Sequence, residues 1–338
     1  MKIRKKPIGF AIFGCGEMGK IHARNVWLDP DFQLLYVVDP IIELAEKISR
    51  NYGCLACPNI NDALADENVD FIIIASTTDA HEEQVLACAS TRKAFLCEKP
   101  IASSLKSALN CVHAVESNNC HSAMGFNRRL DEEYRFIRQE VHSGRIGSVE
   151  TMHLVSRSFN KSSVTPKLFS SGMIREKGTH FFDLSSWILG FDPVETYATG
   201  AKFKGSRGDD SDFDTATVVV RYENEVIVSF NFNQKAKFGQ DEFIEIVGTD
   251  GMILTGRSST GDTKIFTDKG IFQKGIHQSW YKRFQQTYTE ELKLLVETSA
   301  QKKLKIASLR DGLKAQAIAE ASIESMIRKQ LVKIEKVW

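Results

Sequence analysis

The sequence lacks the features of membrane and nucleic-acid-binding proteins. No apolar run is long enough to span a bilayer, and the run nearest the start, Ile8–Phe13, is too short for the core of a signal peptide. The formal net charge is only +1 over 338 residues, so no basic surface for nucleic acid or anionic lipid is expected. We therefore expect a protein that binds neither nucleic acid nor membrane.

Cysteine is scarce and has no framework spacing. The chain has 7 Cys, an odd number that argues against a disulfide-stapled secreted fold and indicates reduced thiols in the cytoplasm. Cys54 and Cys57 form the one close pair, and no second pair or His partner follows at the spacing of a zinc site. We therefore expect a cytoplasmic protein without a bound metal.

The first part of the chain alternates apolar runs with helical patterns, which predicts βαβ units and a parallel sheet. A length of 338 residues also favours two domains. We therefore assign residues 1–124 to a nucleotide-binding domain of the Rossmann type. The expected strands are Ile8–Phe13, Leu34–Val38, Phe71–Ala75, Ala94–Cys97 and His121–Met124, and the expected helices are Lys20–Trp27, Ile41–Tyr52, Asn61–Asp66, His81–Ser90 and Ser104–Ser117.

The rest of the chain has a different pattern. After a helix at Asp131–Ser143, short alternating segments joined by short connections predict a large, open, mostly antiparallel sheet. We assign residues 125–338 to an α+β domain for substrate binding and oligomerisation, and the whole chain to the α/β class. The expected strands are Val149–Ser158, Thr215–Tyr222, Val226–Asn233, Glu242–Val247, Met252–Thr255 and Lys264–Thr267, with loops at Lys161–Ser171 and Gly200–Asp214. Two final helices are expected, one at Tyr281–Ser299 and one that begins at Ser308, whose relation to Asp311 resembles a capping box.

A glycine-rich turn follows the first apolar run. Gly14, Gly16 and Gly19 have the G-x-G-x-x-G spacing, in which the glycines permit the turn, the approach of a pyrophosphate and helix packing. Asp39 ends the next apolar run, where an acid binds the adenosine ribose and repels the 2′-phosphate of NADP. The alternative is a glycine turn of some other α/β protein. The turn and Asp39 predict NAD in preference to NADP, and we assign to the cofactor Gly14, Cys15, Gly16, Glu17, Met18, Gly19 and Asp39.

Polar residues follow two further strands. Ser76 and Thr77 come directly after Phe71–Ala75, at the carboxyl end of a parallel strand, where such sheets bind ligands. In the alternative, Thr78 or Asp79 only caps the next helix. We assign Ser76, Thr77 and His81 to cofactor binding.

Lys99 follows the strand Ala94–Cys97, between Glu98 and Pro100. Pro100 restricts Lys99 to extended geometry, which could aim its ammonium at a substrate oxygen and stabilise alkoxide charge. The alternative is a surface lysine beside a turn. Glu98 and Lys99 are also assigned to the cofactor site.

His180 lies in the first turn of a helix expected at Thr179–Leu189. Imidazole is a suitable proton acceptor near neutral pH, and a helix N-terminus would keep it neutral. Glu176 and Asp183 could orient it. The alternatives are a capping or core histidine, and a metal site formed with Glu176 and Asp183.

Together these blocks resemble the GFO/IDH/MocA family of nicotinamide-dependent oxidoreductases, and within it the inositol 2-dehydrogenases. The resemblance implies a catalytic lysine at Lys99 and a catalytic His180, with an Asp four positions earlier that is Glu176 here. In addition to these residues, we assign Asn127, Arg157 and Asp183 to substrate binding. The subgroup tends to have an acid and a Pro-rich loop after the Ser-Arg pair, which Ser158–Pro166 lacks. The matching blocks are Gly14–His22, Glu98–Ala102, Gly125–Asp131, Ser143–Gly147, Gly178–Gly190 and Val247–Ile253.

The leading hypothesis is an NAD-dependent dehydrogenase that acts on a secondary alcohol of a cyclic polyol or sugar. The family also implies a homodimer or homotetramer formed through the second sheet. Two alternatives remain open. One is a reductase of a keto-sugar or nucleotide-linked sugar, and the other is a non-catalytic NAD-binding regulator.

Overall fold

The structure is a computed structural model that describes residues 6–158, 172–203, 213–234, 236–255, 264–267, 270–273, 280–301 and 306–338. It has two compact units. The first contains Met1–Asn127, Gln286–Gln316 and Val337–Trp338, and the second contains Arg128–Gln285 and Ala317–Lys336. The described residues 286–301 and 306–316, which the sequence analysis assigns to the second domain, therefore group with the first unit, and the functional division at residues 124 and 125 stays a prediction.

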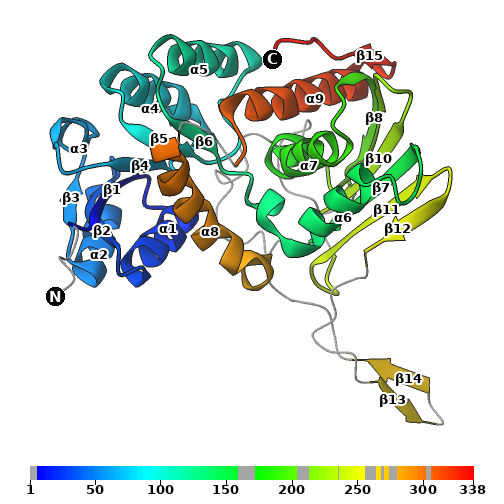
Figure 1. Ribbon diagram of the computed structural model, residues 1–338, viewed down its shortest axis with the longest axis horizontal. Coiled ribbons are helices and arrows are strands. Elements are labelled where there is room, and N and C mark those ends of the chain that lie inside the picture. Colours follow the sequence, from blue (N-terminus) through cyan, green and yellow to red (C-terminus); the bar gives the residue numbers. More distant parts are fainter. Residues whose placement is uncertain are drawn as a thin grey trace. The chain divides into compact units, whose positions relative to one another are not determined.

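The first unit is built on a six-stranded parallel sheet of order β3-β2-β1-β4-β5-β6 (Figure 1). Its central strands are almost wholly buried, because helices cover both faces. The predicted Rossmann sheet is thus confirmed, and only the three-residue β3 escaped the sequence pattern. The strands are β1 Ile8–Phe13, β2 Phe32–Val38, β3 Leu55–Cys57, β4 Phe71–Ile74, β5 Ala94–Cys97 and β6 Ser122–Met124.

The helices of the first unit begin and end at residues suited to those positions. Ser104 caps α5, since its Oγ accepts the N–H of Ser107 at 3.1 Å. Gly53 ends α2 in the left-handed conformation with φ of 70°. The helices before the second unit are α1 Glu17–Leu28, α2 Ile42–Tyr52, α3 Asn61–Ala65, α4 Thr78–Thr91 and α5 Leu105–Ser117.

The second unit contains a seven-stranded sheet of order β12-β11-β7-β10-β9-β8-β15. Only β7 and β10 pair in parallel, so the expectation of a mostly antiparallel sheet is confirmed. The strands are β7 Val149–Arg157, β8 Pro193–Ala201, β9 Thr215–Tyr222, β10 Ile227–Asn233, β11 Asp241–Gly248, β12 Gly251–Leu254 and β15 Val332–Lys333; a separate hairpin consists of β13 Lys264–Thr267 and β14 Gly270–Gln273.

The expected loops correspond only partly to what the structure describes. Gly200 and Ala201 end β8, so the loop expected from Gly200 begins too early. Residues 204–212 of that loop, and the whole loop expected at Lys161–Ser171, lie outside the described residues. β8, β14 and β15 were not predicted, because their side chains do not alternate clearly between apolar and polar.

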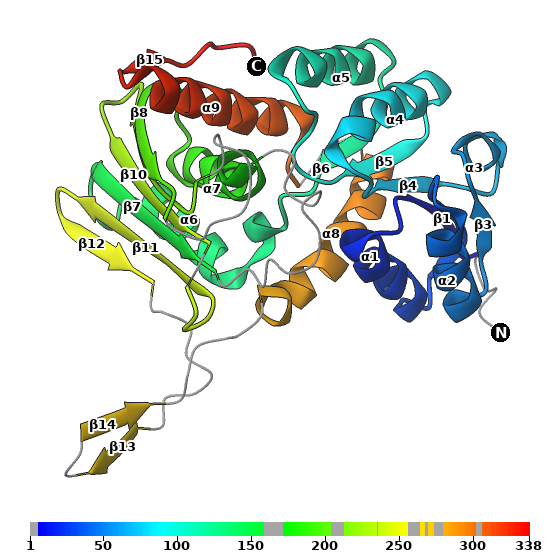
Figure 2. The same ribbon diagram turned by 180° about the vertical axis from the view of Figure 1, so that it is seen from behind.

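Helices α6 and α7 lie on one face of the second sheet (Figures 1 and 2). Aromatic rings join α7 to the sheet, with Phe182 and Phe230 at 4.9 Å between centroids and Phe181 and Phe232 at 5.8 Å. The remaining helices are η1 Asn127–Leu130, α6 Glu132–His142, the π-helix η2 Ile174–Gly178, α7 Thr179–Leu189, α8 Trp280–Gln301 and α9 Leu309–Arg328, the last two of which contribute residues to both units.

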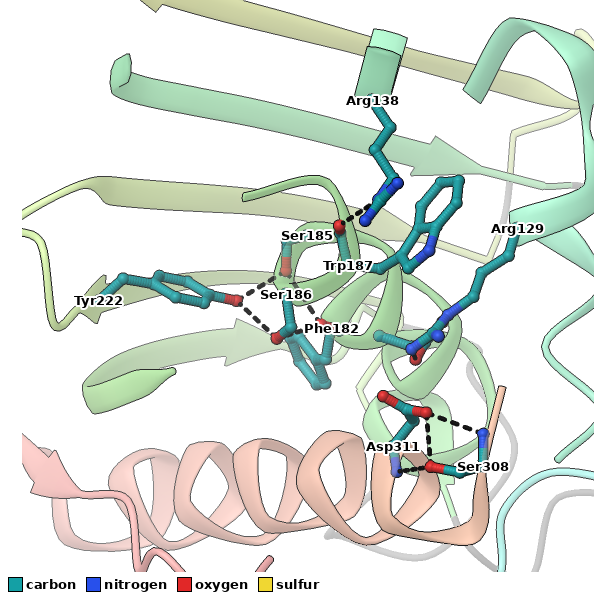
Figure 3. A network of polar contacts seen from close by, with 10 residues as sticks. Arg129, Arg138, Phe182, Ser185, Ser186, Trp187, Tyr222, Ser308 and Asp311 are labelled. Atoms are coloured by element: carbon teal, nitrogen blue, oxygen red, sulfur yellow. Dashed lines mark hydrogen bonds and ion pairs between the residues drawn. The ribbon is translucent and has the colours of Figure 1, made fainter. Parts of the chain in front are cut away.

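Buried polar bonds fix α7 on the sheet. The hydroxyl of Tyr222 lies 2.8 Å from Oγ of Ser185 and 3.2 Å from Oγ of Ser186, and Arg138 donates to the carbonyl of Trp187 (Figure 3). Gly190 then ends the helix with φ of 74°. These contacts fix the rotation of α7 and therefore the direction in which its first turn faces. No helix in the described part of the chain is long and apolar enough to cross a membrane.

Candidate functional site

The glycine turn between β1 and α1 has the steric properties that each glycine requires. Gly14 has φ of +96°, and a Cβ there would lie 2.4 Å from the backbone of Ser76. A Cβ on Gly19 would lie 1.9 Å from the carbonyl oxygen of Gly14. A Cβ on Gly16 would meet no atom within 4 Å, and Gly16 is exposed. Gly14 and Gly19 therefore serve the fold, whereas Gly16 leaves open space above the start of α1.

Asp39 ties the end of β2 to this turn. Its Oδ2 accepts the N–H of Cys15 at 2.8 Å, and its Oδ1 accepts the N–H of Ile41 at 2.9 Å. Each carboxylate oxygen retains a further lone pair for a ribose hydroxyl. No side chain caps the N-terminus of α1 at Gly16, so the backbone N–H groups of its first turn can receive a phosphate. The turn and Asp39 therefore fit a dinucleotide.

Further predicted residues follow strands of the same sheet. Ser76 and Thr77 come after β4, beside the glycine turn, and Oγ of Ser76 donates to Oε1 of Gln84 at 2.8 Å. Helix α4 begins at Thr78 with Thr77 as its N-cap, and Thr77 makes no side-chain capping bond. The alternative in which Thr78 or Asp79 caps this helix is therefore wrong.

Glu98 and Lys99 follow β5, which neighbours β4. Lys99 is half-buried, whereas Glu98 is only 5% exposed and its Oε1 lies 2.8 Å from Nε2 of His22. The structure thus brings the glycine turn, Asp39, Ser76, Thr77 and Lys99 to the carboxyl edge of one parallel sheet, where ligands bind in such folds.

His81 joins two of these loops. Its Nδ1–H donates to the carbonyl of Pro100 at 2.8 Å, and its Nε2 lies 3.3 Å from the carbonyl of Ser76. The ring is 1% exposed. His81 therefore bonds the loops after β4 and β5. Its assignment as a cofactor ligand stays a prediction.

Glu176 and His180 lie on one continuous helical segment. The π-helix η2 leads directly into α7 through Gly178, whose backbone is helical. Helix α7 begins at Thr179, as expected, but η2 runs directly into it, so this turn is not a free helix end and the argument that a helix dipole keeps His180 neutral fails. Glu176 lies in η2, four residues before His180 and on the same face of this segment. Such π-turns occur frequently at functional sites.

Lys177 is a residue that the sequence analysis missed. Its Nζ donates to the carbonyls of Ser156 and Asn233 at 3.1 and 2.9 Å, and to Oγ of Ser158 at 2.9 Å. Burial lowers the pKa of Lys177 to about 7. These bonds hold η2 to the ends of β7 and β10, and no sequence pattern identifies a helical lysine that binds the ends of distant strands.

Three residues assigned to substrate binding are bonded to protein groups. Asp183 accepts two bonds from Arg129, at 2.9 and 2.5 Å. Arg157 donates to Asp241 at 3.0 Å, and Asn127 is fully buried and donates to Thr287 at 2.8 Å. Contact of these three with a substrate stays a prediction, and residues 159–166 of the divergent loop lie outside the described residues.

The described residues contain no group of three or more His, Cys, Asp and Glu side chains that could hold a metal ion. Glu176, His180 and Asp183, the metal site considered from the sequence, therefore find no support there. All seven cysteines are free thiols.

The sheet order, the glycine turn and Asp39 define a dinucleotide-binding oxidoreductase fold. Comparison with family models is more specific: the NAD-binding Rossmann domain of the GFO/IDH/MocA oxidoreductases matches residues 8–126, and their C-terminal alpha/beta domain matches residues 138–334. The chain therefore belongs to the GFO/IDH/MocA oxidoreductase family, whose members act on CH–OH groups.

Similar proteins include several inositol dehydrogenases. An inositol 2-dehydrogenase of Rhizobium meliloti is 30% identical over 97% of this chain and 99% of that protein. A myo-inositol 2-dehydrogenase of Thermotoga maritima is 27% identical over 96% of this chain and 98% of that protein. The crystal structure of myo-inositol 2-dehydrogenase from Lactobacillus plantarum has a TM-score of 0.89 and 25% identity, covering 98% of this chain and all (100%) of that one.

Proposed function

We propose that this protein is an NAD-dependent dehydrogenase that oxidises a secondary alcohol of an inositol-like cyclic polyol. The observation that carries the proposal is the position of Lys99 after β5, at the sheet edge that also bears the glycine turn and Asp39. The names of the similar inositol dehydrogenases support the substrate class.

NAD is the cofactor that the residues favour. The first turn of α1 would hold the pyrophosphate and Asp39 the adenosine ribose, with Cys15, Glu17 and Met18 lining the turn. The carboxylate of Asp39 would repel the 2′-phosphate of NADP, and the residues that follow, Pro40 and Ile41, supply no cation to offset it. When bound, NAD supplies the acceptor for a hydride.

The protein's own residues would handle the proton and the charge. His180 would take the hydroxyl proton, because neutral imidazole is a base near neutral pH. Lys99 would donate to the same oxygen and stabilise alkoxide charge. Glu176, on the same helical face as His180, would orient its ring or bind a neighbouring hydroxyl, while Asn127, Arg157 and Asp183 would bind the remaining hydroxyls after releasing some of their present bonds.

A second candidate function is a non-catalytic NAD-binding regulator. The observation that favours it is Glu176, which stands where the family pattern has Asp. The test is a panel of inositols, sugars and keto-sugars assayed by the absorbance of the reduced cofactor, with NAD and with NADP. We expect turnover of at least one inositol with NAD. Reduction of keto-sugars alone would favour the reductase, and tight NAD binding without any turnover would favour the regulator.

We also propose that the open face of the second sheet binds a second copy of the chain in the cytoplasm. The face opposite α7 carries half-exposed apolar side chains, among them Tyr197 (45% exposed), Ile227 (48%) and Met252 (54%). Light scattering of the purified protein tests this, and a monomer at micromolar concentration would contradict it.

A further inference from the structure

Two buried histidines hold the segment Glu98–Pro100 from opposite ends. We propose that His22 and His81 are positioning residues that fix the backbone around Lys99 and so set the direction of its ammonium. This inference rests on the proposed function of Lys99. Neither histidine needs to contact the substrate, because each acts through a neighbour of Lys99.

His22, on α1, binds the side chain before Lys99. Its ring is fully buried, and Nε2 lies 2.8 Å from Oε1 of Glu98. A carboxylate only accepts, so Nε2–H donates. Nδ1 makes no hydrogen bond among the described residues, and a protonated ring would bury an unpaired N–H there. The geometry therefore requires a proton on Nε2, which points at Glu98.

The carboxylate of Glu98 has little freedom to move. A Cβ on residue 125 would lie 2.9 Å from Oε2 of Glu98, so Gly125 provides the space that this oxygen occupies. The backbone N–H of Glu98 donates to the carbonyl of Ile74 at 2.9 Å. The ring of Tyr288 meets His22 edge-on, with 5.9 Å between centroids, and limits its rotation. Glu98 is thus fixed by its backbone and by its side chain.

A second buried carboxyl, that of Glu291, interacts electrostatically with Glu98. Glu291, on α8, is 1% exposed, and its Oε2 has no hydrogen-bond partner among the described residues. Burial, together with the charge of Glu98, raises the pKa of Glu291 well above its usual value. Burial therefore favours the protonated form of Glu291, while the side chain of Glu98 is held by its contact with His22.

His81, on α4, holds the residue after Lys99. Its bond to the carbonyl of Pro100 at 2.8 Å fixes the chain on that side, and its other nitrogen faces the carbonyl of Ser76. Helices α1 and α4 begin at the two loops assigned to the cofactor. Movement of either loop on cofactor binding would therefore be transmitted to Lys99.

The test measures Lys99 directly by competitive acylation with acetic anhydride, followed by mass spectrometry, in the full-length protein. Exposed Lys47 on α2 serves as the internal reference. We expect His22→Phe and His81→Phe each to change the labelling rate of Lys99 relative to Lys47 by about threefold or more, equivalent to about half a pKa unit. On an active substrate kcat should fall about tenfold, with a smaller change in KM.

His121→Phe is the matched control. His121 belongs to the same unit and also bonds a carbonyl, that of Leu295 at 3.1 Å, but has no bond to the Glu98–Pro100 segment. We expect it to lower the melting temperature and leave the labelling of Lys99 unchanged. If His22→Phe does not fold, His22→Gln takes its place: it offers an N–H donor, and labelling closer to wild type than in His81→Phe is expected.

Unchanged labelling of Lys99 in folded His22→Phe and His81→Phe proteins would overturn the inference, whatever their activity. Labelling requires no turnover, so it remains informative if the proposed function fails. Conversely, full activity of Lys99→Met would refute the role of Lys99 without altering the labelling result. The two failures are therefore distinguishable.

Discussion

Asp39 binds the backbone of Cys15 across the glycine turn, with 2.8 Å between Oδ2 and the amide nitrogen. One carboxylate therefore shapes the turn and faces the place expected for the adenosine ribose. We therefore expect the stability of the fold and the cofactor preference to change together when this position is altered.

Replacement of Asp39 should affect both properties. Asp39→Ala is expected to weaken NAD binding about tenfold or more, shift the preference toward NADP, and lower the free energy of unfolding by about 1–3 kcal/mol because the amide of Cys15 loses its partner. Calorimetric titration with both cofactors and urea unfolding measure this. Asp31→Asn, which alters an exposed carboxylate of the same unit, should change neither. Equal loss of affinity for both cofactors would contradict the proposed discrimination.

Gly16 and Gly19 should respond oppositely to the same substitution. Gly16→Ala adds a methyl group to open space, so the melting temperature should stay within about 2 °C, while NAD affinity falls about tenfold because the methyl obstructs the pyrophosphate. Gly19→Ala places its methyl 1.9 Å from the carbonyl oxygen of Gly14 and should destabilise the fold by about 2 kcal/mol or more. Thermal melts with and without NAD separate the two effects. Unaltered NAD affinity in Gly16→Ala would contradict the proposal that this turn binds the pyrophosphate.

Because of Lys177, the free energy of unfolding should rise as the pH increases above 7. Its pKa is about 7 in the folded protein against 10.5 ordinarily, so between these values the unfolded chain binds more protons and stability rises with pH. Lys177→Met should abolish this rise in stability, which amounts to about 5 kcal/mol over the whole range between the two pKa values. Urea unfolding across this pH range measures the difference, with exposed Lys333→Met as the control. Parallel curves for wild type and Lys177→Met would show that the buried amine keeps an ordinary pKa.

Glu291 should have the opposite dependence. Its pKa is raised above 4.5 in the folded protein, so above that pH the folded state binds more protons and stability falls as pH rises. Glu291→Gln mimics the neutral acid and should be more stable than wild type at neutral pH, with the difference vanishing at acid pH. Glu297→Gln, which alters an exposed residue of the same helix, should leave the stability unchanged. A variant that loses stability at every pH would refute a neutral Glu291.

The parts of the site that depend on local sequence could be predicted. The glycine turn, Asp39 and the strand ends at Ser76 and Lys99 follow from spacing and from the rule that parallel strands place their carboxyl ends at one edge. The helix at Thr179–Leu189 was correct in its bounds, but the π-helix before it was not foreseen, because Gly178 is typically a helix breaker and here has a helical backbone.

Pairings between distant residues could not be predicted. His22 and Glu98 are 76 positions apart, and Arg157 and Asp241 are 84 apart. Arg157 and Asp241 are partners in the register of β7 and β11, and His22 reaches Glu98 through the packing of α1 beside the end of β5, neither of which propensity or periodicity specifies. The same holds for Lys177, whose three acceptors come from two strands.

The central claim is that Lys99 and His180 serve hydride transfer from an inositol-like alcohol to NAD. Steady-state production of NADH from a panel of inositols by the wild type, Lys99→Met and His180→Ala tests it most directly. We predict measurable turnover by the wild type, a loss of about a hundredfold or more in kcat for each variant, and NAD affinity within about threefold of wild type. Wild-type turnover that persists in Lys99→Met would contradict the account.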